Sequence, residues 1–377
     1  MPKVILVANT DWYLYNFRFS LIKTLQEKGF TPVLVSPMGR FVEIFREQGW
    51  EHHEWQVGRQ SVLPWQEIPS VKQLQNIYQR VQPDLVHHHT NKAVLYGTMA
   101  ARKFNIPVIN SIPGTGYVFS SPTLKARLLK PITEGMFNLY LTPYQKQQMI
   151  FENRGEMAYF IKKKFIPGEK AILIPSVGVN LSKYDGTAPK PTDKPVIAFI
   201  GRMLWGKGVG VFADAAKILK EKKVNCRMVL IGLPDFDNPD FVPTEILQNW
   251  QEQGILEWWG WREDMPATYQ VIDILAQPTQ YGEGVPTTLI EASASRRAVI
   301  ATDWPSCREV IKHGQTGLLV RPGDAADLAD KISELVDNPQ QRNNLAENAY
   351  ALVSNKFSTE HVNEETLGVY ERVMGNI

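Results

Sequence analysis

Short apolar runs alternate with amphipathic segments along the first half of the chain. The runs are VILVA, TPVLVS, DLVHHH and PVINSI, and between them lie FRFSLIKTLQEKG and KAVLYGTMAARKFN, where apolar residues recur at helical spacing. Buried strands that alternate with helices of about ten to fifteen residues are typical of βαβ units and a parallel sheet. The pattern therefore predicts an α/β domain.

The same pattern begins again after a stretch without periodicity. Gly, Pro, Ser and Lys accumulate in SVGVNLSKYDGTAPKPTDKP, which predicts a domain boundary near residues 176–195. Six further buried strands are then predicted in PVIAFIG, CRMVLIG, ILEWWGW, DILAQPT, AVIATD and GLLVRPGD. We expect two Rossmann-like, doubly wound domains, 1–185 and 186–377, facing each other across a cleft. The C-terminal helix is a candidate to cross back to the first domain.

The composition excludes several classes of protein. With 44% apolar and 21% charged residues and no biased tract, the chain is expected to be globular rather than disordered. Its start, MPKVILVANT, lacks the features of a secretory signal, and no apolar run approaches the roughly 20 residues that cross a bilayer. Cys226 and Cys307 cannot form a disulfide framework. The sequence predicts a cytoplasmic protein.

Charge is divided unevenly between the two halves. Residues 1–185 hold 22 Lys/Arg and 13 Asp/Glu, whereas the remainder holds 19 and 26. A basic half suits nucleic acid, a phosphorylated substrate or a lipid surface, although an unevenly charged solvated surface is the plain alternative. Nucleic acid would leave the acidic second half unexplained, and no recognised nucleic-acid motif is present.

The second domain opens with a strand followed by the glycine-rich turn GRMLWGKG. Free N–H groups at such a turn, and the start of the next helix, attract anions. The Arg202 guanidinium can donate two parallel hydrogen bonds to phosphate oxygens, and the Lys207 ammonium adds a mobile positive charge. Alone this is a weak motif, because a Gly-rich turn with surface cations is often purely structural.

A second strand, loop and helix, DILAQPTQYGEGVPTTLIEASA, carry two carboxylates around a Gly-Val-Pro turn. Pro286 suits a first helical turn, so the N–H groups around Gly284 and Val285 can bind a second part of the same phosphate group. Glu291 suits the hydroxyls of a ribose and Glu283 those of a sugar. A capping carboxylate and an exposed loop residue are the plain alternatives, but the nearby GRMLWGKG favours the binding role.

These segments resemble a known enzyme family. GRMLWGKG and EGVPTTLIEASASRRAVIATD look like the G-R-[LM]-x-x-x-K-G and E-G-x-P-x-x-x-x-E-A segments of the retaining glycosyltransferases of family four, which have the GT-B fold. DLVHHHTNKAVLYG, IPGTGYVFSS, YNFRFSLIKTL and IPSVGVNLSKY resemble bacterial surface-polysaccharide transferases that extend undecaprenyl-diphosphate-linked sugars. The resemblance spans nearly the whole chain. It implies transfer of a sugar from a nucleotide sugar, expected to be UDP-linked, to a lipid-linked saccharide.

The resemblance also implies roles for single residues. Arg202 and Lys207 are expected to bind the donor diphosphate and to stabilise charge on the leaving group, and Glu283 to bind the donor sugar; these three are the catalytic candidates. No side chain is an evident covalent nucleophile. The acceptor is therefore expected to attack on the same face of the sugar from which the diphosphate leaves, and neither a cofactor nor a metal ion is expected to be required. The further donor-binding candidates are Gly284, Val285, Pro286, the ribose-binding Glu291, and Trp261 and Arg262 near the base.

The chain departs from the family pattern at two places. Arg296 and Arg297 stand in SASRRAVIA where many relatives have Gly and Pro, and Pro113 stands where many have a histidine near the donor sugar. No catalytic histidine is therefore assigned. The alternatives are a non-catalytic nucleotide-sugar-binding protein, or an enzyme of this architecture that uses a soluble acceptor or acts as an epimerase. A nicotinamide dehydrogenase is disfavoured, because no G-x-G-x-x-G follows either first strand.

Acceptor candidates lie in three segments of the first domain. NTDWYLYNFR is predicted to be a loop after the first strand, and its aromatic residues can stack on a sugar or pack in the core. Adjacent side chains of His87-His88-His89 point in different directions and make a poor metal cage, so an acceptor contact near Thr90 is considered instead. Glycines of IPGTGY can close over a sugar. The candidates are Asn16, Arg18, His89, Lys92, Gly114, Gly116 and Tyr117.

A basic, leucine-rich segment, LKARLLK, is a candidate for contact with a membrane. Lys125, Arg127 and Lys130 would then hold the protein peripherally at the inner face of the cytoplasmic membrane. Leucines that face the core are the alternative. Asp235-Phe236-Asp237 has the form of a D-x-D metal motif, but it lies in LPDFDNPD and is predicted to be a turn.

Overall fold

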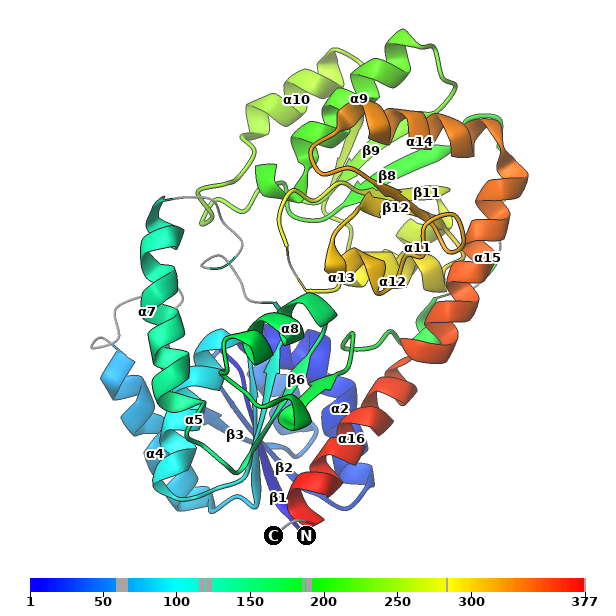
Figure 1. The fold of residues 1–377 in the computed structure, drawn as a ribbon. Coiled ribbons are helices and arrows are strands. Elements are labelled where there is room, and N and C mark those ends of the chain that lie inside the picture. Colours follow the sequence, from blue (N-terminus) through cyan, green and yellow to red (C-terminus); the bar gives the residue numbers. More distant parts are fainter. Residues whose placement is uncertain are drawn as a thin grey trace. The chain divides into compact units, whose positions relative to one another are not determined.

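The computed structural model describes residues 1–58, 67–114, 119, 124–184, 187, 192–282 and 284–375. The chain divides into two compact units, one formed by Met1–Val177 with Thr359–Ile377 and the other by Gly178–Ser358. Figure 1 shows a sheet flanked by helices in each unit. The predicted boundary, between residues 185 and 186, lies outside the described residues.

The first unit contains a seven-stranded parallel sheet in the order β3-β2-β1-β4-β5-β6-β7. Four strands match predicted runs: β1 (Lys3–Val7), β2 (Thr31–Ser36), β4 (Leu85–His89) and β5 (Val108–Ile112). Three were not predicted: β3 (Glu51–Glu54), β6 (Gln147–Phe151) and β7 (Ala171–Leu173). Because β2 and β4 flank β1 on opposite sides, the topological switch point lies between β1 and β4.

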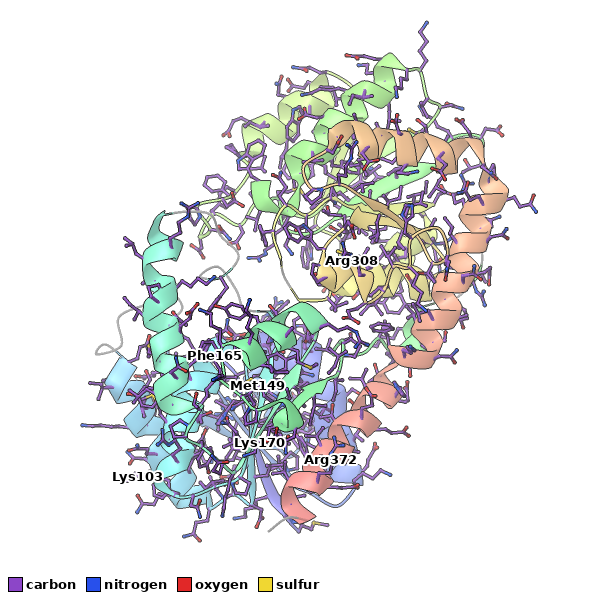
Figure 2. All side chains as sticks on the ribbon, in the orientation of Figure 1. Lys103, Met149, Phe165, Lys170, Arg308 and Arg372 are labelled. Atoms are coloured by element: carbon purple, nitrogen blue, oxygen red, sulfur yellow. The ribbon has the colours of Figure 1, made fainter. Side chains whose placement is uncertain are left out.

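Helices cover this sheet and complete its core. Met149 and Phe165 are fully buried there, whereas Lys103 and Arg372 extend from the surface (Figure 2). The C-terminal helix α16 packs beside α2. The longer helices are α2 (Phe19–Glu27), α3 (Val42–Glu47), α4 (Ile68–Val81), α5 (Asn91–Lys103), α7 (Leu124–Tyr140), α8 (Arg154–Lys162) and α16 (Thr359–Gly375).

The segment that follows β1 is helical, so the predicted loop was wrong. A short α-helix, α1 (Asp11–Tyr13), continues into a π-helical turn, η1 (Leu14–Arg18), and then into α2. The Thr10 hydroxyl caps the start by accepting a hydrogen bond from the Tyr13 N–H at 3.1 Å. The Phe17 ring lies 5.2 Å from each of the rings of Trp12 and Tyr13. Aromatic packing of this kind stabilises a helical turn that sequence spacing did not reveal.

The second unit contains a six-stranded parallel sheet in the order β10-β9-β8-β11-β12-β13. All six predicted strands are confirmed: β8 (Val196–Ile200), β9 (Arg227–Ile231), β10 (Glu257–Gly260), β11 (Ile274–Gln277), β12 (Ala298–Thr302) and β13 (Leu318–Val320). The order reverses at β8, so the switch point lies between β8 and β11, where a doubly wound sheet binds ligands. Both units have the predicted α/β architecture.

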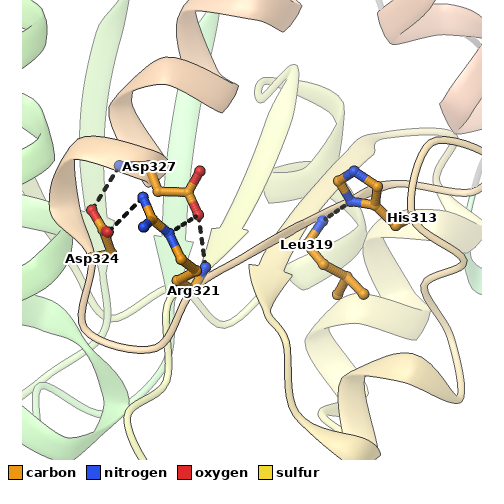
Figure 3. A network of polar contacts seen from close by, with 5 residues as sticks. All are labelled: His313, Leu319, Arg321, Asp324 and Asp327. Atoms are coloured by element: carbon orange, nitrogen blue, oxygen red, sulfur yellow. Dashed lines mark hydrogen bonds and ion pairs between the residues drawn. The ribbon is translucent and has the colours of Figure 1, made fainter.

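Helices flank both faces of the second sheet as well. They are α9 (Val209–Glu221), α10 (Thr244–Glu252), α11 (Met265–Gln270), α12 (Thr287–Ala294), α13 (Pro305–Arg308), α14 (Ala325–Asp337) and α15 (Pro339–Lys356). Figure 3 shows how α14 begins: the Asp324 carboxylate accepts the Asp327 N–H at 2.9 Å, and Asp327 accepts the Arg321 N–H at 2.8 Å. The carboxylates of Asp324 and Asp327 therefore accept local backbone hydrogen bonds at the start of α14.

Candidate active site

The turn GRMLWGKG joins β8 to α9 and approaches the loop after β11 very closely. Gly208 has a φ of +88°, and a Cβ there would lie 1.9 Å from the Pro278 carbonyl oxygen. Both the backbone conformation and the lack of space therefore require glycine. The short 3-10 helix Trp205–Lys207 precedes it, so Lys207 is held directly before Gly208, the N-cap of α9.

Hydrogen bonds join this turn to the loop that precedes α12. The Gln280 N–H donates to the Gly206 carbonyl at 2.8 Å, and the Gln280 side-chain amide donates to the Trp205 carbonyl at 3.3 Å. A Cβ at Gly206 would lie 2.2 Å from the Tyr281 ring. The two segments that were expected to share a diphosphate are thus in direct contact at the ends of adjacent strands.

Arg202 is exposed at the start of the turn and is already paired. Its guanidinium lies 2.7 Å from the Asp235 carboxylate, in the loop after β9. A second aspartate of that loop, Asp240, accepts the Gly206 N–H at 2.7 Å. Two carboxylates of this unit therefore contact groups that sequence analysis assigned to an anion.

Glu291 lies in α12 among hydroxyl groups. This helix begins at Thr287, with Pro286 as its N-cap rather than inside its first turn. The Tyr269 hydroxyl donates to the Glu291 carboxylate at 2.9 Å, and the Tyr184 hydroxyl also hydrogen-bonds to it. Burial of the carboxyl raises the pKa of Glu291 to about 7, and the two hydroxyls oppose that shift. The residue keeps a partly exposed surface.

Sequence reasoning missed the groups that fix this part of the site. Tyr184 and Tyr269 come from segments far from Glu291 in sequence, and their rings contact each other at 5.9 Å. The Gln277 amide donates to the Ile200 carbonyl at 2.6 Å and to the Thr288 hydroxyl at 3.0 Å. Gln277 thereby ties β8, β11 and the first turn of α12 together. Gln277, a polar residue at the end of a predicted buried strand, was the feature of the sequence that could have indicated this arrangement.

The other donor candidates are placed less closely. The Trp261 side chain is 69% exposed, and the Arg262 guanidinium lies over the Trp259 ring at 5.3 Å. Val285 is buried in the core below the turn, and Gly284 and Pro286 flank it in sequence. Glu283 lies outside the described residues.

The SASRRAVIA segment adopts a turn that usually favours glycine. Arg296, which follows α12, has a φ of +52°. Its guanidinium lies 3.8 Å from the centroid of the Tyr350 ring and pairs with Glu347. These contacts offset the strain of a left-handed residue, which explains how the chain dispenses with glycine at this turn.

At the switch point of the first unit the polar side chains are buried. Arg18 was predicted to lie in a loop after the first strand, but it is in a helical segment and only 6% exposed, and its guanidinium donates to the Tyr13 hydroxyl at 3.1 Å. Asn16 is exposed and donates to the Trp12 carbonyl at 2.9 Å. Helical folding of residues 11–18 causes this difference, since it turns Arg18 inward.

Arg18 belongs to a buried polar cluster that includes His87, His89 and Glu152. His87 hydrogen-bonds to the hydroxyls of Tyr370 and Ser111, both at 2.6 Å, and its ring lies 3.9 Å from that of His89. Burial lowers the pKa of both histidines well below the usual value and raises that of Glu152 to about 8. Sequence analysis missed Glu152, which directly follows β6.

Several polar atoms of this cluster lack hydrogen bonds. Among the described residues, neither ring nitrogen of His89 has a partner, and Arg18 Nε and Glu152 Oε1 have none. Buried polar groups are normally satisfied, so these atoms remain able to hydrogen-bond to a bound polar group. Arg18 lies close enough to Glu152 and both histidines for its charge to lower the pKa of each of them.

The remaining acceptor candidates are scattered. The Lys92 ammonium pairs with the buried Glu67 carboxylate at 2.7 Å, which gives it a local partner. The Asn91 amide donates to the Gly114 carbonyl at 3.3 Å, which brings Gly114 near the end of β4. Gly116 and Tyr117 lie outside the described residues.

The helix α7 exposes both apolar and basic residues. Leu128, Ile132 and Leu139 are 64%, 51% and 60% exposed, and Arg127 is exposed beside them. The Lys130 ammonium instead lies over the Phe119 and Tyr159 rings at 5.7 and 5.4 Å. The Lys125 side chain lies outside the described part of the chain. The leucines of this helix do not all face the core.

Among the described residues, no three His, Cys, Asp or Glu side chains are grouped so that they could hold a metal ion. None of the described helices combines the length and the apolar character needed to cross a membrane.

Family comparisons agree with this architecture. Residues 183–352 match the family described as glycosyl transferases group 1, and residues 3–151 match glycosyl transferase 4-like. The chain is a glycosyltransferase with the GT-B fold. Both matched families are glycosyltransferase families, and the two matched regions together cover most of the chain.

Individual relatives are bacterial. The chain is 28% identical over 377 residues, 97% of each protein, to the N,N'-diacetylbacillosaminyl-diphospho-undecaprenol alpha-1,3-N-acetylgalactosaminyltransferase of Campylobacter jejuni. It is 22% identical over 287 residues, 72% of each protein, to the UDP-Gal:alpha-D-GlcNAc-diphosphoundecaprenol alpha-1,3-galactosyltransferase of Escherichia coli.

Solved structures share the fold. A glycosyltransferase from Rickettsia africae superposes with a TM-score of 0.82 at 20% identity, covering 100% of this chain and 99% of that one. Anabaena HepE, in complex with UDP and glucose, superposes with a TM-score of 0.78 at 18% identity, covering 98% of this chain and 100% of that one. These similarities confirm the predicted fold class.

Proposed function

We propose that this glycosyltransferase transfers a sugar, with retention of configuration, from a UDP-sugar to a polyprenyl-diphosphate-linked saccharide. The observation that carries the proposal is the direct contact between the turn at Gly206 and the loop at Gln280, which joins the two candidate diphosphate-binding segments. The named relatives from Campylobacter jejuni and Escherichia coli act on diphospho-undecaprenol-linked sugars, which supports the choice of acceptor.

Arg202 and Lys207 would stabilise the leaving group. In the proposed step the bond between the anomeric carbon and the donor diphosphate breaks, and a bond to the acceptor oxygen forms on the same face. The acceptor proton passes to the leaving diphosphate. Fixed cations near the developing charge lower the barrier to such a step.

Glu291 would accept hydrogen bonds from the ribose hydroxyls of the donor. Tyr184 and Tyr269 orient its carboxylate, and a carboxylate has acceptor sites beyond the two that they use. Glu283, Gly284, Val285 and Pro286 would surround the donor sugar and diphosphate, and Trp261 and Arg262 would lie near the base. These roles require neither a cofactor nor a metal ion.

The first unit would bind the acceptor and the membrane. Asn16, Arg18, His89, Lys92, Gly114, Gly116 and Tyr117 remain the proposed acceptor residues. The apolar residues exposed on α7, together with Arg127, suit the interface of an anionic bilayer, which would hold the enzyme peripherally at the inner face of the cytoplasmic membrane.

Ligand binding and turnover together test the proposal. Purified protein is heated with a panel of nucleotide sugars that includes UDP-galactose and UDP-N-acetylgalactosamine, because a ligand of the native state raises the apparent Tm. Release of UDP is then measured with and without a polyprenyl-diphosphate-linked saccharide. We expect stabilisation by one UDP-sugar and release only with the acceptor. No stabilisation by any nucleotide sugar would refute the donor site.

Vesicle binding tests the membrane role. Neutralising Lys125, Arg127 and Lys130 together should weaken binding to anionic vesicles, most strongly at low salt. Neutralising Lys217, Lys220 and Lys222 of the second unit changes the net charge equally and provides the control. Equal losses in both triple variants would assign the effect to overall charge rather than to α7.

A further inference from the structure

The loop between β9 and α10 places two carboxylates on the turn GRMLWGKG. Asp240 accepts the Gly206 N–H at 2.7 Å, and its carbonyl accepts the Trp205 N–H at 2.9 Å. Asp235 lies 2.7 Å from the Arg202 guanidinium. The proposed function requires a bound diphosphate at this turn. The loop between β9 and α10 already places two carboxylates of the protein at the same position.

The two aspartates contribute differently to the structure. Asp240 contacts the backbone of the turn, and nearby backbone hydrogen bonds from Met203 and Val242 reinforce this attachment. Asp235 contacts the turn through one ion pair between side chains that are 57% exposed for Arg202 and 28% exposed for Asp235. Arg202 can therefore leave Asp235 without any rearrangement of the turn.

We propose that Asp235 competes with the diphosphate for Arg202 and thereby promotes release of the nucleoside diphosphate product. This inference rests on the proposed function, in which Arg202 binds the donor diphosphate. A guanidinium has a limited number of N–H donors. Asp235 must therefore give up its contact with Arg202 when a phosphate accepts hydrogen bonds from the same N–H groups. Any phosphate bound there also meets the negative charge of Asp235.

Competition of this kind distinguishes product from donor. The terminal phosphate of a nucleoside diphosphate titrates near pH 6, so the product carries about one more negative charge at neutral pH than the nucleotide sugar does. Repulsion by Asp235 is therefore greater for the product. Asp235 acts through Arg202 and is a positioning residue that favours turnover over tight binding.

The plain alternative is an ordinary surface ion pair that has no effect on ligand binding. Exposed pairs are weak, which makes the expected change modest, about two- to fivefold in Kd. Asp237 provides a matched control, because it is exposed in the same loop and makes no ion pair among the described residues. Asp235→Asn and Asp237→Asn remove the same charge two positions apart.

Calorimetric titration tests the inference with three probes: UDP, UDP-galactose and inorganic pyrophosphate. Pyrophosphate reports on the diphosphate contact without a base or a sugar. We expect Asp235→Asn to bind UDP and pyrophosphate about two- to fivefold more tightly, with a smaller gain for UDP-galactose and a decrease in every gain at high salt. Inhibition of turnover by UDP should become stronger. Asp237→Asn should show smaller gains.

Arg202→Ala separates failure of the inference from failure of the proposed function. If Arg202→Ala weakens UDP binding but Asp235→Asn does not differ from Asp237→Asn, the inference is wrong and the donor site stands. If Arg202→Ala leaves the affinity for UDP unchanged, or if neither UDP nor pyrophosphate binds, the donor site and the inference both fail. In the double variant, the gain from Asp235→Asn should disappear.

Discussion

The two units share a topology, but they use the switch point of the sheet differently. At the switch point between β8 and β11, the second unit exposes Arg202. The turn GRMLWGKG lies there and is hydrogen-bonded through its backbone to the loop after β11. At the junction of β1 and β4, the first unit buries Arg18 and Glu152, which come from distant parts of the chain. The Arg202 charge of the second unit is therefore exposed to solvent, whereas Arg18 and Glu152 of the first unit are shielded from it.

The largest effect that this comparison predicts is on the stability of the first unit. Arg18→Met removes the charged group that donates a hydrogen bond to the buried Tyr13 hydroxyl and should lower the free energy of unfolding by about 3 kcal/mol. Arg46→Met, at an exposed pair with Glu43, should change it by less than about 0.5 kcal/mol. Urea denaturation measures both. Equal effects would show that the Arg18 charge is unimportant to the fold.

In the second unit, the corresponding change should affect turnover rather than stability. Lys207→Ala should lower kcat about a hundredfold, because a fixed cation near the leaving diphosphate is lost. Lys217→Ala, at an exposed pair with Asp214 on α9, is the control and should retain activity. Thermal denaturation checks that both variants stay folded. Near-normal turnover of a folded Lys207→Ala protein would contradict the proposed role.

Stability should also depend on pH through Glu152. Its pKa is raised from 4.5 in an ordinary environment to about 8, so the folded state keeps a proton that the unfolded chain releases. This contribution to stability is fully present below about pH 4.5 and is lost as pH rises towards about 8. The Tm of Glu152→Gln relative to wild type should therefore rise between these values. A constant difference would mean that Glu152 does not titrate as described.

The smallest predicted effect concerns donor affinity in the second unit. With the pKa of Glu291 at about 7, the ribose hydroxyls of the proposed donor would meet an ionised carboxylate only as the pH rises through that value. The affinity for a UDP-sugar should increase by up to about tenfold between about pH 6 and about pH 8. Glu291→Gln should bind more weakly and show no such increase. Nucleotide sugars suit this titration, because they lack the terminal phosphate that ionises near pH 6.

Sequence patterns predicted most strands that have continuous apolar runs, but β7 (AIL) and β6 (QQMIF) were missed. All six strands of the second unit follow buried runs and were predicted, and so were the four strands β1, β2, β4 and β5. The edge strand β3 has the sequence EHHE, which no apolar pattern can reveal, because one side of an edge strand is solvated. The helix at residues 11–18 was missed, since aromatic packing rather than apolar spacing determines it.

The candidate site was predictable only in its local parts. GRMLWGKG and the Gly-Val-Pro turn are contiguous, so their glycines and charges could be recognised together. Tyr269 and Tyr184 reach Glu291 through tertiary structure, and Asp235 reaches Arg202 in the same way. Glu152 is 134 positions from Arg18 in sequence. No spacing rule joins such residues, because the fold alone brings them together.

The return of α16 to the first unit has a consequence for biosynthesis. Its Tyr370 hydroxyl bonds to His87, and its Asn363 amide donates to the hydroxyls of Ser20 and Thr24, both at 3.0 Å. Because domains generally fold from the N-terminus during synthesis, the second unit can fold before the first is complete. The first unit would then remain without its last helix on the ribosome, and early termination of translation anywhere before residue 359 would leave its core permanently open.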